Sequence, residues 1–144
     1  MNVQEVFTLA IESGQYREGN FMCNDVETLR MRGKITMSEA DDVTVAINRQ
    51  MQHMSAYVYT VCGYNASVHT TMYSQVAALV RVVLWENAGS PEPFDRSLYK
   101  VRNSTEVDAC IMRMYKDWSR RNEIVKEFVD SYRVTNVSVK EEKQ

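Results

Sequence analysis

Seven basic side chains gather in residues 96–121 of this chain, which has 144 residues and a formal net charge of −2. Three acidic residues oppose them, so the segment carries a net charge of +4. On the helix that we expect over residues 104–132, spacings of three and four place Arg113, Lys116 and Arg120 on one face, with Arg121 beside them. Such a face suits the phosphates of nucleic acid or of an anionic nucleotide. The alternative is a solvated helix surface, because acidic residues follow one turn later.

Cys62 and His69 are the nearest thiol and imidazole in the sequence. A nucleophilic enzyme would need such a pair together with an orienting acid. Asp41 or Asp42 would have to approach the pair in three dimensions, and nothing in the sequence places them there. A packed thiol is the simpler interpretation of Cys62. We therefore expect a protein that is not an enzyme.

The three cysteines and two histidines are too widely spaced for a structural metal site. Structural zinc takes four ligands, which a chain usually supplies in close pairs such as C-x-x-C. The sequence also contains neither an Asp-rich calcium loop nor a Gly-rich phosphate loop. We expect no metal and no cofactor.

Four tyrosines lie close together in the sequence, at Tyr57, Tyr59, Tyr64 and Tyr73. One helix face is too narrow to bury all four, so some of them should remain exposed. The chain also has nine methionines, whose flexible side chains fill core gaps and suit adaptable binding surfaces. Because aromatic side chains are enriched in interfaces, these tyrosines predict contact with a partner protein or with a second copy of the chain.

Helices must position these side chains. Five glycines and two prolines leave long stretches in which apolar residues recur every three or four positions. The pattern predicts an all-α bundle of about five helices, which we expect over residues 3–13, 21–33, 36–62, 67–87 and 104–132. The clearest helix start is the capping box from Thr36 to Glu39, in which each residue satisfies a free amide of the other.

Residues 56–73 allow a second interpretation. They are rich in β-branched and aromatic side chains, so 57–61 and 68–72 would form a hairpin around 63–65, and the fold would be α+β. We favour helix, because the apolar stripe that begins at Ala40 continues without a break to Val61.

The length suits one domain. We expect residues 1–134 to form it and 135–144 to be a polar C-terminal tail. The longest apolar run, 76–85, is interrupted by Arg81 and is too short to cross a bilayer. No signal peptide is visible, and three widely spaced cysteines do not form a disulfide framework. We therefore expect no membrane partner and a location in the cytoplasm.

Three short motifs occupy the first third of the chain. They are Gly14-Gln15-Tyr16, Phe21-Met22-Cys23 and a helix start that runs from Gly33-Lys34-Ile35-Thr36 to Glu39. Together they resemble an N-terminal pattern of small accessory proteins of tailed bacteriophages, in which Gly-x-Tyr, Phe-Met-Cys and Gly-x-Ile-Thr-x-x-Glu follow one another. The resemblance implies a phage origin and action in the bacterial host cytoplasm. It implies no chemistry, because that family has no assigned function.

These features lead to one expectation and one alternative. We expect a non-enzymatic, phage-encoded helical interaction protein that binds and modulates or inhibits a host protein, for example a defence factor, and that forms a homo-oligomer. The alternative is a protein that binds nucleic acid or an anionic nucleotide through the basic helix face. Binding that is sensitive to salt would favour the alternative.

Overall fold

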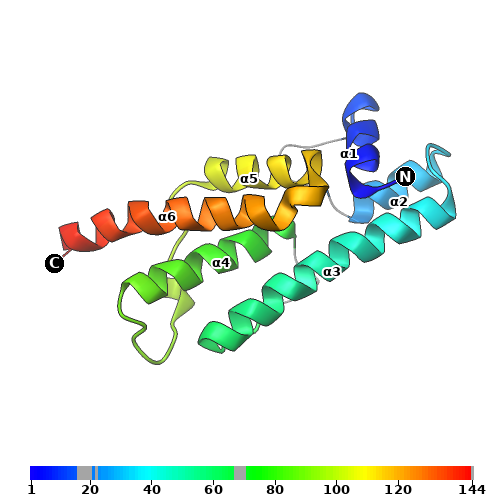
Figure 1. The fold of residues 1–144 in the computed structure, drawn as a ribbon. Coiled ribbons are helices and arrows are strands. Elements are labelled where there is room, and N and C mark those ends of the chain that lie inside the picture. Colours follow the sequence, from blue (N-terminus) through cyan, green and yellow to red (C-terminus); the bar gives the residue numbers. More distant parts are fainter. Residues whose placement is uncertain (16–20, 22, 67–70, 144) are drawn as a thin grey trace.

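The computed structural model describes residues 1–15, 21, 23–66 and 71–143, with side chains as far as Tyr132. This part of the chain forms six α-helices and two short 3-10 helices, and it contains no strand. The α-helices are α1 (Val3–Glu12), α2 (Cys23–Met31), α3 (Met37–Cys62), α4 (Met72–Asn87), α5 (Ser104–Lys116) and α6 (Arg121–Lys143), and the 3-10 helices are η1 (Arg96–Leu98) and η2 (Trp118–Arg120). The predicted all-α bundle is confirmed (Figure 1).

α4 is the central helix of the bundle. It contacts α3, α5 and α6, and Figure 1 shows it lying between α3 and α6. Ten of its sixteen residues are buried, because a helix that is apolar on most of its surface must be covered from several sides. The buried helix predicted to extend to residue 87 is confirmed. The helix begins at Met72, after Thr71, whose hydroxyl accepts a hydrogen bond from the Ser74 amide at 3.1 Å. The predicted start near Ser67 lies outside the described residues.

α3 follows the predicted long helix closely. The capping box is present: the Glu39 amide donates to Thr36 Oγ1 at 3.1 Å, and the Thr36 amide donates to Glu39 Oε1 at 2.9 Å. The helix ends at Cys62, after which Gly63 takes a left-handed conformation with φ 72°. The side chains that form its buried stripe include Ala40, Val43, Ile47, Met51, Met54 and Val58.

The α+β alternative is wrong, because residues 57–62 belong to α3 rather than to a strand. Most of the second strand of that hairpin falls in 67–70, which lie outside the described residues. The unbroken apolar stripe was therefore a better guide to structure here than the local content of β-branched and aromatic residues.

Three aromatic rings connect α1 to the C-terminal end of α5. The ring centroids of Phe7, Phe21 and Tyr115 lie 4.9 to 5.3 Å apart, and all three side chains are buried. The Tyr115 hydroxyl also donates a hydrogen bond to the Phe21 carbonyl oxygen at 2.8 Å.

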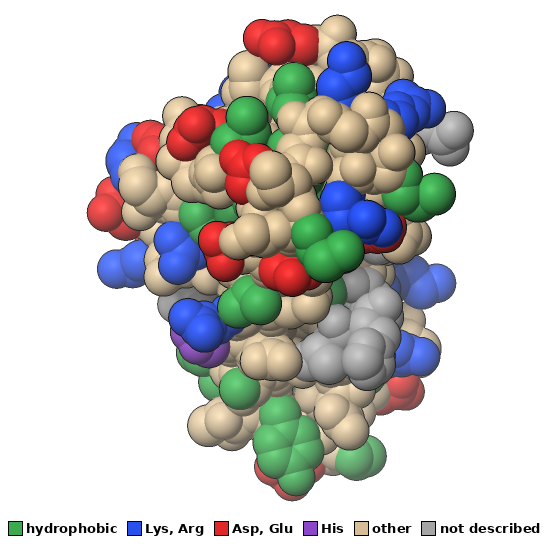
Figure 2. Space-filling view, turned by 90° about the vertical axis from the view of Figure 1, so that its right-hand side faces the viewer, with side chains coloured by type: hydrophobic (Ala, Val, Ile, Leu, Met, Phe, Trp, Pro, Cys, Tyr) green, Lys and Arg blue, Asp and Glu red, His purple; other side chains and the backbone are tan. Residues whose placement is uncertain are grey.

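Figure 2 views the molecule from the side on which α1 and α2 lie, and basic and acidic side chains are interspersed over that face.

The predicted long helix over 104–132 is wrong. The chain leaves the helical conformation at Asp117 (φ −132°, ψ 73°), and α5 and α6 pack side by side as an antiparallel pair (Figure 1). Asp117 accepts a hydrogen bond from the Ser119 hydroxyl at 2.8 Å, a local contact that competes with helical hydrogen bonding. α6 then continues to Lys143. The division into a domain over 1–134 and a polar tail over 135–144 stays a prediction.

Candidate functional site

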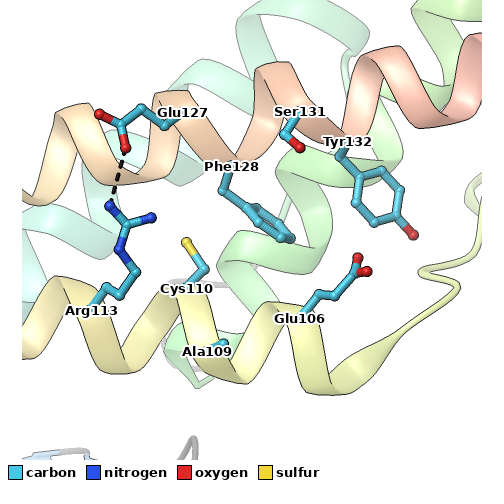
Figure 3. Close-up of a pocket in the computed structure, with 8 residues that line it drawn as sticks. All are labelled: Glu106, Ala109, Cys110, Arg113, Glu127, Phe128, Ser131 and Tyr132. Carbon is cyan, nitrogen blue, oxygen red and sulfur yellow. Dashed lines mark hydrogen bonds and ion pairs between the residues drawn. The ribbon is translucent and has the colours of Figure 1, made fainter.

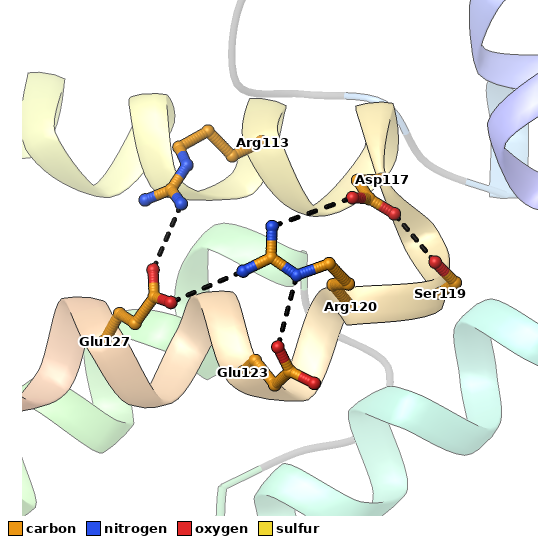
Figure 4. Close-up of polar contacts among 6 residues, drawn as sticks. All are labelled: Arg113, Asp117, Ser119, Arg120, Glu123 and Glu127. Atoms are coloured by element: carbon orange, nitrogen blue, oxygen red, sulfur yellow. Dashed lines mark hydrogen bonds and ion pairs between the residues drawn. The ribbon is translucent and has the colours of Figure 1, made fainter.

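The turn between α5 and α6 brings two of the predicted binding cations onto acidic side chains (Figure 4). Arg113 forms an ion pair with Glu127 at 3.1 Å. Arg120 lies 3.2 Å from Glu123, 3.5 Å from Glu127 and 3.9 Å from Asp117. These carboxylates, Glu123 first, raise the pKa of the Arg120 guanidinium. Both arginines are therefore compensated by the protein itself.

The other two predicted cations are arranged differently. The Arg121 guanidinium lies 5.1 Å from the centroid of the Trp118 ring, and its Nε donates to Gln50 Oε1 at 3.1 Å. Gln50 belongs to α3 and is 4% exposed, so Arg121 connects the start of α6 to α3. Lys116 is exposed and forms no ion pair with any residue that the structure describes.

The predicted common face of Arg113, Lys116 and Arg120 does not exist as one helix surface, because the helix ends between Lys116 and Arg120. Anion binding by these side chains stays a prediction. The regular helical spacing on which that prediction rested is absent.

A groove of about 320 Å³ lies between α5 and α6 (Figure 3). Cys110 faces it from α5 and Phe128 from α6, while the Arg113–Glu127 ion pair crosses one end. Burial raises the pKa of the Cys110 thiol to about 12, against a smaller lowering by Arg113. The thiol is therefore protonated at neutral pH, and protonated thiols are poor nucleophiles.

Cys62, the thiol of the pair considered from the sequence, is also engaged in structure. Its Sγ donates to the Val58 carbonyl oxygen at 3.1 Å, and burial raises its pKa. Asp41 and Asp42 lie near the start of α3, about 30 Å from Cys62 at 1.5 Å per residue, so they cannot orient a catalytic pair there. His69 lies outside the described residues.

Metal ligands do not gather in the described part of the chain. No group of three or more His, Cys, Asp or Glu side chains is placed there so that it could hold an ion. The expectation that the protein uses no metal or cofactor stays a prediction.

The four tyrosines separate into two pairs. Tyr57 and Tyr59 project from α3 and are 51% and 60% exposed, which confirms that part of the set is not buried. Tyr64 and Tyr73 are half-buried. The Tyr64 ring packs on Phe94 at a centroid distance of 5.7 Å, and its hydroxyl accepts a hydrogen bond from an arginine, described below. Contact of the tyrosines with a partner stays a prediction.

Tyr57 lines a groove of about 500 Å³ that three helices enclose. Met54 of α3, Leu79 of α4 and Val125 of α6 contribute buried apolar surface to it. Lys126 and Asp130, two exposed charged residues of α6, also line it. Sequence reasoning missed this groove because its residues come from three helices, and only the packing of α3 and α6 on opposite sides of α4 brings them together.

A second unpredicted pocket, of about 490 Å³, lies between α4 and the segment after it. Arg81, Arg96 and Lys100 line it together with Tyr73, and none of its described lining residues is acidic. The sequence shows one sign of the side of the pocket that α4 forms. Tyr73 and Arg81 are eight residues apart, with Ala77 midway, so all three share one face of α4.

Among the helices of the described residues, none has both the length and the apolar character that a membrane crossing requires. The chain was also compared with known proteins. No family model, no curated protein and no solved structure matches it.

Proposed function

We propose that this chain is a non-enzymatic helical protein of phage origin that binds and modulates a host protein in the bacterial cytoplasm. The groove between α3, α4 and α6 is the observation that carries the proposal. Its buried apolar side chains and its volume of about 500 Å³ suit the apolar face of one partner helix. The phage origin rests on the N-terminal motifs alone.

Tyr57 is the expected anchor of this interaction. Half of its surface is exposed at the groove, and large aromatic side chains beside apolar pockets often dominate binding energy. Lys126 and Asp130 carry opposite charges on the α6 side of the groove, so they favour one orientation of a polar partner surface.

The state of the thiols supports a role without catalysis. Burial raises the pKa of both Cys62 and Cys110, so neither is a thiolate at neutral pH. A Cys62→Ser variant should therefore bind the host partner as the unmodified chain does. Loss of function in that variant, with the fold retained, would instead indicate an enzyme.

The proposal is tested by capture from bacterial lysate, with Tyr57→Ala compared with Tyr59→Ala. Both tyrosines project from α3, but only Tyr57 is among the residues that line the groove. We expect one host protein to be retained at high salt, and its affinity for the purified chain to fall about tenfold or more in Tyr57→Ala only. The proposal would be contradicted if the chain is a strict monomer that retains no host protein. It would also be contradicted if Tyr57→Ala and Tyr59→Ala lose the same affinity for the host protein.

Light scattering on the purified chain distinguishes the second possible occupant of the groove. A dimer that Tyr57→Ala dissociates and Tyr59→Ala does not would show that a second copy, rather than a host protein, binds the groove. A monomer at all concentrations leaves the host protein as the occupant and removes the expected homo-oligomer.

A further inference from the structure

The pocket beside α4 gathers three cations from three segments of the chain. Arg81 belongs to α4, Arg96 to η1, and Lys100 to the loop before α5. We propose that this pocket binds the phosphate groups of a small ligand, a nucleoside polyphosphate by size and chemistry. The site shares no lining residue with the α3–α4–α6 groove and does not depend on the function proposed for that groove.

Arg81 is the residue that most clearly suits the pocket to an anion. Its side chain forms no ion pair and no hydrogen bond with any residue that the structure describes. Its Nε is buried without an acceptor, an arrangement that is costly for a charged donor. An anionic ligand beside the guanidinium would supply the counter-charge that the described part of the protein does not.

Arg96 is held in place without being neutralised. Its guanidinium donates to the Tyr64 hydroxyl and lies 5.2 Å from the centroid of the Tyr64 ring. The neighbouring Asp95 is occupied elsewhere: its carboxylate accepts from the Ser97 hydroxyl at 2.6 Å and from the Ser97 amide at 3.0 Å. These two hydrogen bonds hold the pKa of Asp95 below its ordinary value. The Asp95 carboxylate thus binds Ser97. Arg96 forms no ion pair within the described residues.

An aromatic cluster fixes the segment that carries the loop cations. The Phe94 ring lies 5.5 Å from Trp85, 5.7 Å from Tyr64 and 5.9 Å from Tyr99, measured between centroids. Trp85 Nε1 also donates to the Pro91 carbonyl oxygen at 2.7 Å. Because Trp85 is part of α4, these contacts pack the loop against the helix that carries Arg81, the third cation. A site organised in this way before binding loses less entropy when the ligand arrives.

The shape of the pocket indicates more than a single phosphate. Ala77 contributes only a methyl group to the wall between Tyr73 and Arg81, which leaves room beside α4. Three cations on separate segments match the spread charge of a diphosphate or triphosphate, and the Tyr73 ring offers an aromatic surface for a base. A volume of about 490 Å³ is of the size that small-molecule sites have in proteins.

Isothermal titration calorimetry of the full chain tests the proposal with three probes: ATP, inorganic pyrophosphate and adenosine. We expect ATP and pyrophosphate to bind and adenosine to bind at least about tenfold more weakly than ATP. Arg81→Gln and Lys100→Gln should each weaken pyrophosphate binding about tenfold. Lys116→Gln removes the same charge from an exposed lysine of α5 and should change nothing. Ala77→Met, which fills the pocket and leaves every charge in place, should weaken ATP binding.

Three results would overturn the proposal. The first is no binding of ATP or pyrophosphate, and the second is an equal loss of affinity in Lys116→Gln and Lys100→Gln. The third is tighter binding of a single-stranded oligonucleotide than of ATP with the same sensitivity to Lys100→Gln, which would make nucleic acid the ligand. Lys100 is exposed, so its variant keeps the test decisive if Arg81→Gln fails to fold. Tyr57→Ala should leave ATP affinity unchanged, which separates this proposal from that for the groove.

Discussion

Two groups of basic side chains in this bundle differ in their acidic neighbours. At the α5–α6 turn, Arg113 and Arg120 share Glu127, and Arg120 has two further carboxylates within 4 Å. In the pocket beside α4, the described lining includes three cations and no acid. The sequence suggested the first group as the anion site. The difference teaches that a count of basic residues is a poor guide to which of them remain uncompensated.

The physical reason for the difference is the helix break at Asp117. A continuous helix would separate Arg113 from Glu127 by almost four turns, at 3.6 residues per turn. The turn reverses the chain and places the Glu127 carboxylate 3.1 Å from the Arg113 guanidinium. In the pocket beside α4, the acid nearest in sequence to Arg96 is Asp95, and its carboxylate accepts hydrogen bonds from Ser97 instead.

The largest expected effect comes from Phe94→Ala, which removes the ring that holds the loop cations. ATP affinity should fall more than about tenfold, and the free energy of unfolding by about 2 kcal/mol, because a half-buried aromatic ring is lost. Calorimetry and urea unfolding measure the two quantities. Leu98→Ala, a change at a side chain that is 69% exposed in the same loop, is the control and should alter neither. Unchanged ATP affinity in Phe94→Ala would contradict the account of the pocket, because ATP binding would then not depend on the loop that Phe94 holds in place.

Arg121→Gln sharpens the comparison from the other region. It removes the contact with Trp118 and leaves the buried Gln50 oxygen without its arginine donor, so stability should fall by about 1.5 kcal/mol. Pyrophosphate affinity should not change. A loss of affinity without a loss of stability would return Arg121 to the role in anion binding that the sequence suggested.

Cys110 tests whether burial affects the pKa of this thiol more than Arg113 does in the α5–α6 groove. Its pKa rises from 9.0 to about 12 on folding, so the stability that this thiol contributes is complete below pH 9 and is lost as the pH rises towards 12. Between pH 8 and pH 10 the free energy of unfolding should fall by about 1 kcal/mol more in the unmodified chain than in Cys110→Ala. Parallel pH profiles for the two proteins would show that Arg113 keeps the thiol ionisable.

Glu127→Gln has the smallest expected effect and the most specific one. It leaves Arg113 without its ion-pair partner and removes one of the three carboxylates around Arg120, so pyrophosphate should bind the turn about threefold more tightly in calorimetry. Stability should fall by less than about 1 kcal/mol, because these pairs are exposed. Asp130→Asn removes the same charge from α6 outside the network and serves as the control. An equal gain in both variants would mean that net charge alone governs anion binding.

Much of the fold follows from the sequence, because it is encoded locally. The Thr36–Glu39 capping box and the apolar stripe from Ala40 set the start and the buried face of α3. The turn at Asp117 was missed, although the charged Arg121 interrupts the apolar spacing close to it. A single charged residue in a stripe is ambiguous, and only tertiary packing decides whether the helix ends there.

The candidate sites follow from the sequence much less. Exposure of part of the tyrosine set was expected, because one helix face cannot bury all four, and Tyr57 and Tyr59 are exposed. The cationic pocket was not, because Arg81 and Lys100 are nineteen residues apart and meet only through the packing of Phe94. Arg81 has one trace in the sequence, as the charge that interrupts the longest apolar run.

The most direct test of the contrast between the two regions is an NMR titration of the isotopically labelled chain with pyrophosphate. It reports on each region in one experiment through the backbone amide signals. We predict that signals of Ala77, Ser97 and Val101 shift in proportion to ligand, while those of Arg113, Glu123 and Glu127 stay in place. Shifts confined to the α5–α6 turn would contradict the account, because the compensated arginines would then be the ones that bind.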